Sequence, residues 1–170
     1  TGAHKMLVRD YRPKTLPAGK AAATVYLHGG GWVVGSPDTH DNICRLLAER
    51  SGARVFSVDY RMGSEHRHPA AIDDCRAAWE WLAREADSLG VDASRIAVAG
   101  DSAGGNLAAV LSLELRATML PKPCLQVLIY PSVDSTDAAP KDAAIDEGYG
   151  LDRPLMRWFR GHYTSGPADL

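Results

Sequence analysis

Short apolar runs alternate with amphipathic stretches along most of the chain. Four runs, bounded by Gly, Pro or Asp, predict β-strands over residues 22–28, 54–59, 95–99 and 124–130. A weaker alternation over residues 5–12 predicts a strand at the edge of a sheet. Because helical patterns separate the four strands, we expect an α/β fold with a mostly parallel sheet and helices on both of its faces.

The helical patterns place apolar residues three or four positions apart. The clearest stripe consists of Ile72, Cys75, Trp79, Leu82 and Ala86. Two further helices carry Ile43, Leu46 and Leu47 on one face, and Leu107, Leu111 and Leu115 on a helix that opens at Ser102. A last helix is predicted over residues 153–163, where Asp152-Arg153-Pro154 forms a start signal and Leu155, Trp158, Phe159, His162 and Tyr163 recur at helical spacing.

The composition of the chain changes near residue 131. Residues 131–150 are rich in Asp, Ala, Pro and Gly and predict a loop before the last helix. We therefore divide the chain into a core over residues 1–130 and a loop-and-helix segment over residues 131–170.

The overall composition is typical of a globular chain large enough for one sizeable core, with 170 residues, 45% hydrophobic and 24% charged. A net charge of -2, without a long run of either sign, predicts no nucleic-acid partner and no electrostatic attraction to membranes. No apolar stretch approaches the roughly 20 residues that span a bilayer, and no signal-peptide pattern opens the chain. We therefore expect no membrane span.

Cysteines and paired histidines raise the questions of disulfides and metals. Cys44, Cys75 and Cys124 are odd in number and lie in apolar-periodic segments, which predicts buried reduced thiols and a cytoplasmic location. His66 and His68 alternate without a third ligand nearby, so we expect a structural role for them and no metal site.

The strongest chemical signal is Gly100-Asp101-Ser102-Ala103-Gly104, which fits the pattern G-x-S-x-G. A predicted strand enters this segment and a predicted helix leaves it, as the pattern requires. The glycines permit a turn so tight that larger side chains would clash, and the serine hydroxyl is pushed into the open. The pattern predicts Ser102 as a nucleophile and the Ala103 N–H as a donor to a developing oxyanion, aided by the helix dipole. The plainer interpretation is a strand–helix connection without chemistry.

A second signal, His28-Gly29-Gly30-Gly31-Trp32, directly follows the first of the four strands. Three successive glycines leave their N–H groups free to approach a substrate oxygen, as in the oxyanion loop of lipases and esterases. A phosphate-binding loop is the alternative, but no Lys-Ser/Thr pair follows and no G-x-G-x-x-G opens a helix. We interpret His28 as a residue that holds this loop, not as the catalytic base, and Asp101 as a structural hydrogen-bonding residue.

Together, the motifs resemble those of the hormone-sensitive-lipase-like esterases, the bacterial family IV of the α/β-hydrolase superfamily. The resemblance covers nearly the whole chain and adds Asp59-Tyr60-Arg61, Glu65-His66, Pro69-Ala70-Ala71, Gly105-Asn106-Leu107-Ala108 and Tyr130-Pro131 to the two motifs.

This resemblance implies the α/β-hydrolase fold, with Ser102 as nucleophile and an oxyanion hole formed by the backbone N–H groups of Gly30, Gly31 and Ala103. It also implies hydrolysis of small carboxylic esters with short or medium acyl chains, through an acyl-enzyme and without a cofactor. By the same resemblance, the helix over residues 153–163 belongs near a cap that borders the acyl pocket.

The chain departs from the family pattern after its last helix. The resemblance places the acid and the histidine of the catalytic triad after two further strands, beyond residue 170, so we expect the sheet to be incomplete. His162 is the only histidine after Ser102, but it lies on the predicted cap helix; Asp134 is the least unsuitable acid. Loss of such a base costs on the order of a million-fold in kcat, so we expect the chain alone to be nearly inactive. The uncovered sheet favours association, as a homo-oligomer or with another fragment.

Two other functions stay open. Some relatives of this family keep the glycine loop and the serine turn but bind small molecules as receptors, so the alternative is a non-catalytic binding protein or inactive fragment. A third hypothesis is a short hydrolase whose triad is rearranged around His162 or His28.

Overall fold

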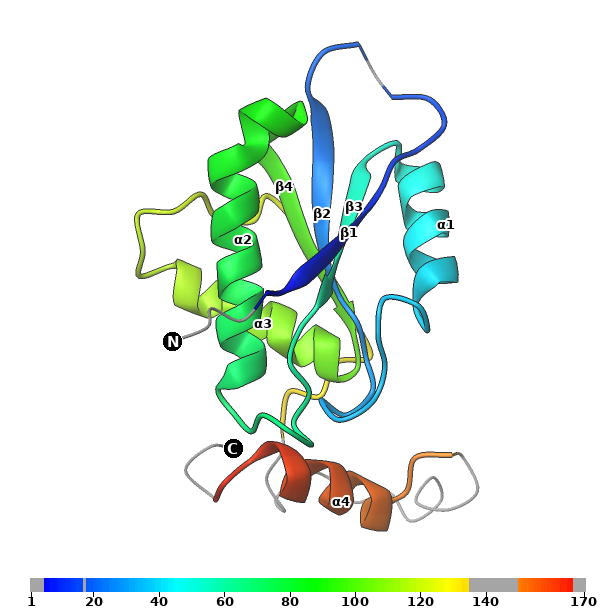
Figure 1. Cartoon of the computed structure of the whole chain (residues 1–170), viewed down its shortest axis with the longest axis vertical. Coiled ribbons are helices and arrows are strands. Elements are labelled where there is room, and N and C mark those ends of the chain that lie inside the picture. The colour runs from blue at the N-terminus through cyan, green and yellow to red at the C-terminus, as the bar shows by residue number, and fades with distance from the viewer. Residues whose placement is uncertain (1–4, 17, 135–149, 167–170) are drawn as a thin grey trace.

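The computed structural model describes residues 5–16, 18–134 and 150–166, and a five-stranded sheet forms their centre (Figure 1). Its strands are β1 (Leu7–Tyr11), β2 (Ala21–Leu27), β3 (Arg54–Asp59), β4 (Val91–Asp101) and β5 (Gln126–Ile129). They lie in the order β1-β3-β2-β4-β5, with β1 antiparallel to β3 and all other neighbours parallel. The predictions of a mostly parallel sheet and of an N-terminal edge strand are therefore confirmed.

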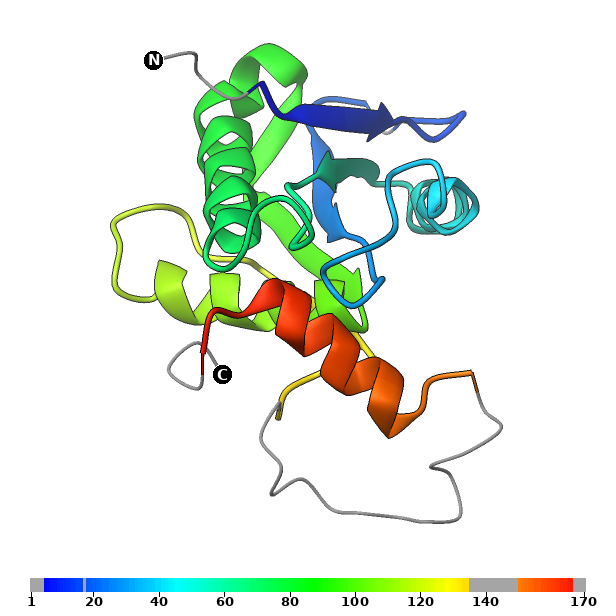
Figure 2. The same cartoon turned by 60° about the horizontal axis from the view of Figure 1, so that its bottom comes forward.

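The helices cover both faces of the sheet. They are α1 (Asp41–Ser51), α2 (Ala70–Leu89), α3 (Ala103–Leu115) and α4 (Arg153–Tyr163). Successive residues of β2 point to opposite faces: Tyr26 packs with Cys44 and Ala48 of α1, while Val25 and Leu27 belong to the cluster that α2 and α3 complete. Figure 2 shows α4 lying across one end of this assembly. No described helix is long and apolar enough to cross a membrane.

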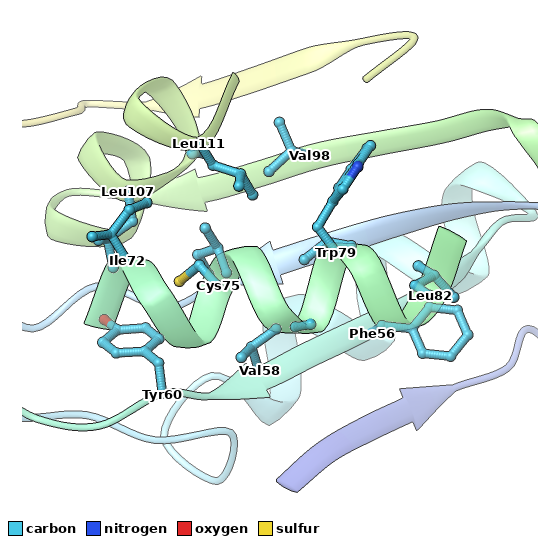
Figure 3. Packing of buried hydrophobic residues seen from close by; sticks show 14 of the residues in the cluster. Phe56, Val58, Tyr60, Ile72, Cys75, Trp79, Leu82, Val98, Leu107 and Leu111 are labelled. Atoms are coloured by element: carbon cyan, nitrogen blue, oxygen red, sulfur yellow. The ribbon is translucent and has the colours of Figure 1, made fainter. Parts of the chain in front are cut away.

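The predicted stripe on α2 forms much of the main core. All five of its residues are buried, and Figure 3 shows four of them, Ile72, Cys75, Trp79 and Leu82, among side chains of β3, β4 and α3. The Trp79 indole N–H donates to the Pro121 carbonyl oxygen at 3.0 Å, so this large ring is buried without losing its polar contact. The stripe on α3 is buried as well, which confirms both predictions.

Two burial predictions are wrong. Leu46 of α1 is 55% exposed, because this helix turns Cys44 and Ala48 toward the sheet instead. Cys124 is also exposed, while Cys44 and Cys75 are buried as predicted. The reason is that β5 begins at Gln126 and lies at the edge of the sheet, so the residues before it have only β4 on one side.

Besides its backbone pairing with β3, the edge strand β1 is linked to the sheet by an ion pair between Asp10 and the buried Arg54. Arg54 is 2% exposed, and its guanidinium donates to the two Asp10 oxygens at 3.1 and 2.5 Å and to the Leu89 carbonyl. Burial alone would raise the pKa of Asp10, but hydrogen bonds from Arg54 and Arg12 outweigh it and lower that pKa. Removal of Asp10 would leave Arg54 charged and buried.

The segment after β5 is described only in part. Residues 135–149, most of the loop predicted over residues 131–150, lie outside the described residues. Helix α4 has the predicted bounds, and the Asp152 carboxylate accepts a hydrogen bond from the Leu155 N–H at its N-terminus, at 2.8 Å. The division of the chain at residue 130 stays a prediction.

Candidate active site

Ser102 occupies the turn between β4 and α3. Its backbone has φ 53° and ψ -119°, between a strand that ends at Asp101 and a helix that begins at Ala103. A positive φ in a residue other than glycine costs about 1–3 kcal/mol. Three hydrogen bonds hold the residue there: its N–H donates to the Ile129 carbonyl at 2.9 Å, and its carbonyl accepts from the N–H groups of Asn106 at 3.0 Å and Ser132 at 3.2 Å. The turn is therefore fixed by β5 and by α3.

Two glycines of the same motif are required by close backbone contacts. A β-carbon on Gly104 would overlap the carbonyl oxygen of Leu27, and one on Gly100 would overlap the carbonyl of Gly104. The first turn of α3 thus lies directly against the end of β2. This contact brings Ser102 to the segment that follows β2.

That segment, residues 28–32, is called the glycine loop below. Because β2 and β4 are parallel neighbours, with Leu27 opposite Gly100, the loop and Ser102 emerge at the same end of the sheet. Gly30 and Gly31 have φ 123° and 59°, which favours glycine. Among the hydrogen bonds of the described residues, no acceptor is bound by the N–H of Gly30, Gly31 or Ala103. The structure therefore places the predicted nucleophile at the same end of the sheet as three N–H groups that have no acceptor among the described residues.

The Asp101 side chain is buried and connects β2, the glycine loop and the segment before α1. Its Oδ1 accepts hydrogen bonds from the Tyr26 hydroxyl at 2.7 Å and the Gly29 N–H at 3.0 Å, and its Oδ2 lies 3.3 Å from His40 Nε2. We call these four residues the Asp101 network. The predicted structural role of Asp101 agrees with these bonds, but no sequence signal indicates Tyr26 or His40, because only the fold brings them to it.

His28 lies fully buried at the end of β2. Its Nδ1 is 2.8 Å from the Gly29 carbonyl, its own carbonyl accepts from the Tyr60 hydroxyl at 2.6 Å, and its ring stacks on Tyr60 with centroids 4.3 Å apart. Burial lowers the pKa of His28, so the neutral ring donates from Nδ1. These contacts support a role in holding the loop.

The pH dependence of stability should report this buried imidazole. Since its pKa is lower in the folded state, the unfolded chain binds its proton first, and stability falls as pH drops below the ordinary value of about 6.5. The free energy of unfolding should be level above that pH and fall below it, by at most about 1.4 kcal/mol per pH unit. Urea titrations between about pH 5 and 8 measure this slope. A His28→Asn variant that kept the full slope would contradict the assignment.

No described histidine forms a hydrogen bond with the Ser102 hydroxyl. His162 packs against Trp158, with ring centroids 4.3 Å apart, and His68 contacts Tyr163 through its backbone N–H at 2.7 Å. The described residues hold no group of His, Cys, Asp or Glu suited to a metal. Among the acids after Ser102, Asp137, Asp142, Asp146, Glu147 and Asp169 lie outside the described residues. The described residues therefore supply no triad base.

Helix α4 lies against the glycine loop, a contact that the sequence patterns did not reveal. The Phe159 ring is so close to Gly31 that a β-carbon there would overlap it, and Tyr163 stacks on Trp32 with centroids 4.8 Å apart. A cavity of about 260 Å³ lies beside these contacts. Its lining mixes apolar and polar side chains: Trp32, His68, Ile72, Asn106, Leu107, Val110, Val133, Arg160, Tyr163 and Thr164.

A strained serine between a central parallel strand and a helix, with a glycine loop beside it, defines an α/β-hydrolase type of protein. The model of a family described by its alpha/beta hydrolase fold matches residues 24–170, and the chain belongs to this family. The chain carries the motifs of the hormone-sensitive-lipase-like group of this family, and relatives that match most of its length are named as esterases.

Curated relatives and solved structures are named as esterases. An ethyl acetate hydrolase of Pseudomonas putida is 46% identical over 168 residues, which cover 98% of this chain and 53% of the relative. Esterase LipI of Mycobacterium tuberculosis is 43% identical, over 90% of this chain and 49% of the relative. A hyperthermophilic esterase of the archaeon Pyrobaculum calidifontis matches with a TM-score of 0.88 and 46% identity, over 96% of this chain and 53% of that one. The chain thus spans about half the length of the relatives it matches.

Proposed function

We propose that the protein is a carboxylesterase in which Ser102 Oγ attacks the carbonyl carbon of an ester. Oγ loses its proton as this bond forms. When the tetrahedral oxyanion collapses, the C–O bond to the alcohol breaks, and the alcohol leaves with that proton while the acyl group stays on Oγ. Water then attacks this acyl-enzyme and releases the carboxylic acid and free Ser102. The observation that carries the proposal is the strained φ of 53° at Ser102, which presents a serine at the turn between β4 and α3.

The oxyanion hole of the proposed reaction consists of the N–H groups of Gly30, Gly31 and Ala103. All three are without an acceptor among the described residues, and they lie at the same end of the sheet as Ser102. The N-terminus of α3 adds a favourable dipole for negative charge. Loss of one such donor costs about 2.7–4 kcal/mol of transition-state stabilisation in a serine protease, which is why their geometry matters.

The proposed substrates are small esters with short or medium acyl chains. The name of the P. putida relative, ethyl acetate hydrolase, and the cavity of about 260 Å³ next to the glycine loop support this size class. We also propose that residues 131–170 form part of a cap over the acyl pocket, since Phe159 and Tyr163 of α4 contact Gly31 and Trp32.

A fluorophosphonate probe tests the nucleophile. It forms a covalent bond to an activated serine, and peptide mapping by mass spectrometry locates the adduct. Because no described imidazole reaches Ser102, we expect slow labelling of Ser102 that added imidazole accelerates by at least about tenfold, as general-base catalysis would. Rapid labelling without imidazole would contradict the absence of a base and support a rearranged triad, while absence of an adduct under both conditions would contradict the esterase proposal.

A non-catalytic binding protein is the second candidate, favoured by the lack of a described base at Ser102. In that case the probe forms no adduct with or without imidazole. Binding of an uncleaved ester analogue, followed by calorimetry, would then measure occupancy of the cavity beside the glycine loop.

We also propose a compartment for the protein and a surface through which it associates. The free thiols of Cys44, Cys75 and Cys124 support a reducing, cytoplasmic compartment, and burial raises the pKa of Cys44 to about 11, which keeps it protonated and unreactive. Association through the β5 edge is supported by exposed apolar side chains there, Val127 at 37% and Tyr130 at 74% exposure.

A further inference from the structure

We propose that Asp101 is a positioning residue that sets the geometry of the oxyanion hole by holding the glycine loop against the Ser102 turn. This inference rests on the esterase function proposed above. In this role Asp101 would affect the rate of the chemical step, in addition to being a structural hydrogen-bonding residue.

The position of Asp101 in the chain is the first support. It directly precedes Ser102, and its Oδ1 accepts the Gly29 N–H at 3.0 Å. Gly29 in turn directly precedes Gly30 and Gly31, whose N–H groups are the proposed donors. One carboxylate therefore connects the backbone that carries the nucleophile to the backbone that carries the oxyanion hole.

The close approach of the two segments is the second support. A β-carbon on Gly29 would overlap Asp101 Oδ2, so only glycine lets the loop come this near. The Gly29 N–H is also the one glycine amide of the loop that is bound to an acceptor among the described residues. The loop is thus held at Gly29, and its next two N–H groups bind no acceptor in the described part of the chain.

The other members of the Asp101 network fix the carboxylate itself. The Tyr26 hydroxyl donates to the same Oδ1 at 2.7 Å, and His40 Nε2 lies 3.3 Å from Oδ2. Tyr26 and Asp101 are both buried, and burial together with this hydrogen bond raises the pKa of Tyr26, so its hydroxyl remains a donor. A buried carboxylate with donors on both oxygens has little freedom to turn away from Gly29.

The catalytic rate should depend on the distance between the N–H groups of the oxyanion hole and the oxyanion. An oxyanion-hole donor acts at about 2.7–3.1 Å from the developing charge, and a misplacement of about 1 Å costs on the order of a hundredfold in rate. Without Asp101 Oδ1, the Gly29 amide has no acceptor, and the loop is free to shift. The chemical step should suffer, while reversible binding of the probe should not.

Three variants of the protein test this role. Asp101→Ala removes both oxygens. Asp101→Asn keeps an amide oxygen that accepts from the Gly29 N–H. Asp10→Ala, on the edge strand β1, is the control: it removes a partly buried, hydrogen-bonded carboxylate far from Ser102 and should lower stability, because Arg54 loses its ion-pair partner.

The measurements are the exchange rate of the Gly29 amide by NMR and the labelling of Ser102 by fluorophosphonate with imidazole present. For Asp101→Ala we expect faster Gly29 exchange and a 10- to 100-fold lower kinact, at roughly unchanged KI. Asp101→Asn should recover about tenfold of that loss, and Asp10→Ala should change neither quantity in the folded protein.

Unchanged exchange at Gly29, or an equal loss of kinact in Asp10→Ala, would overturn the proposal. So would a wild-type kinact in Asp101→Ala, because the loop would then act without its carboxylate. Failure of the esterase function is recognised separately, since the wild-type protein itself would then form no adduct at Ser102.

Discussion

The Ser102→Ala variant is expected to form no phosphonate adduct at residue 102, with or without imidazole. The substitution removes the hydroxyl that the strained turn presents at the end of the sheet where Gly30, Gly31 and Ala103 have N–H groups without an acceptor among the described residues. Alanine and serine meet the same steric cost at φ 53°, so the free energy of unfolding should change by less than about 0.5 kcal/mol. Intact-mass spectrometry after incubation with the probe measures the loss.

A matched serine on α3 provides the control. The Ser112 hydroxyl donates to the Ala108 carbonyl at 2.8 Å, as a helical serine often does, so Ser112→Ala should label at the wild-type rate. An adduct of equal yield in Ser102→Ala would show that another residue reacts and would remove Ser102 from the proposed mechanism.

The Gly104→Ala variant is expected to lose about 3–5 kcal/mol of stability, which is enough to unfold many domains. Its added β-carbon would lie 2.5 Å from the His28 carbonyl oxygen and closer still to that of Leu27. Both are backbone atoms at the end of β2, so no rotamer change relieves the overlap and the helix must move away from the strand. Urea unfolding followed by circular dichroism measures the change.

The same substitution elsewhere gives the opposite expectation. An added β-carbon on Gly161 of α4 meets no atom of the described residues within 4 Å, and alanine favours a helix interior over glycine by about 1 kcal/mol. Gly161→Ala should therefore keep or raise stability. Equal effects of the two substitutions would show that α3 does not pack against β2 as closely as described.

Local sequence patterns predicted the elements well where one physical effect dominated. The prediction of the α2 stripe was right because five apolar residues at helical spacing share one face of the helix. The start of α4 was predictable from Asp152 and Pro154. The predicted burial of Leu46 and Cys124 was wrong, because local apolar character does not show how a helix is rotated or that a strand lies at the edge of the sheet.

The candidate site also has parts that local sequence predicts and contacts that it does not. The turn at Ser102 and the glycine loop were predictable from local sequence, because both depend on glycines that permit backbone conformations and contacts closed to other residues. The folded arrangement was needed to show that Asp101 Oδ1 binds the Gly29 amide, that Tyr26 and His40 hold that carboxylate, and that Phe159 lies against Gly31. Asp101 and Gly29 lie far apart in sequence, and they meet because parallel pairing of β2 with β4 brings the segments after both strands to the same end of the sheet.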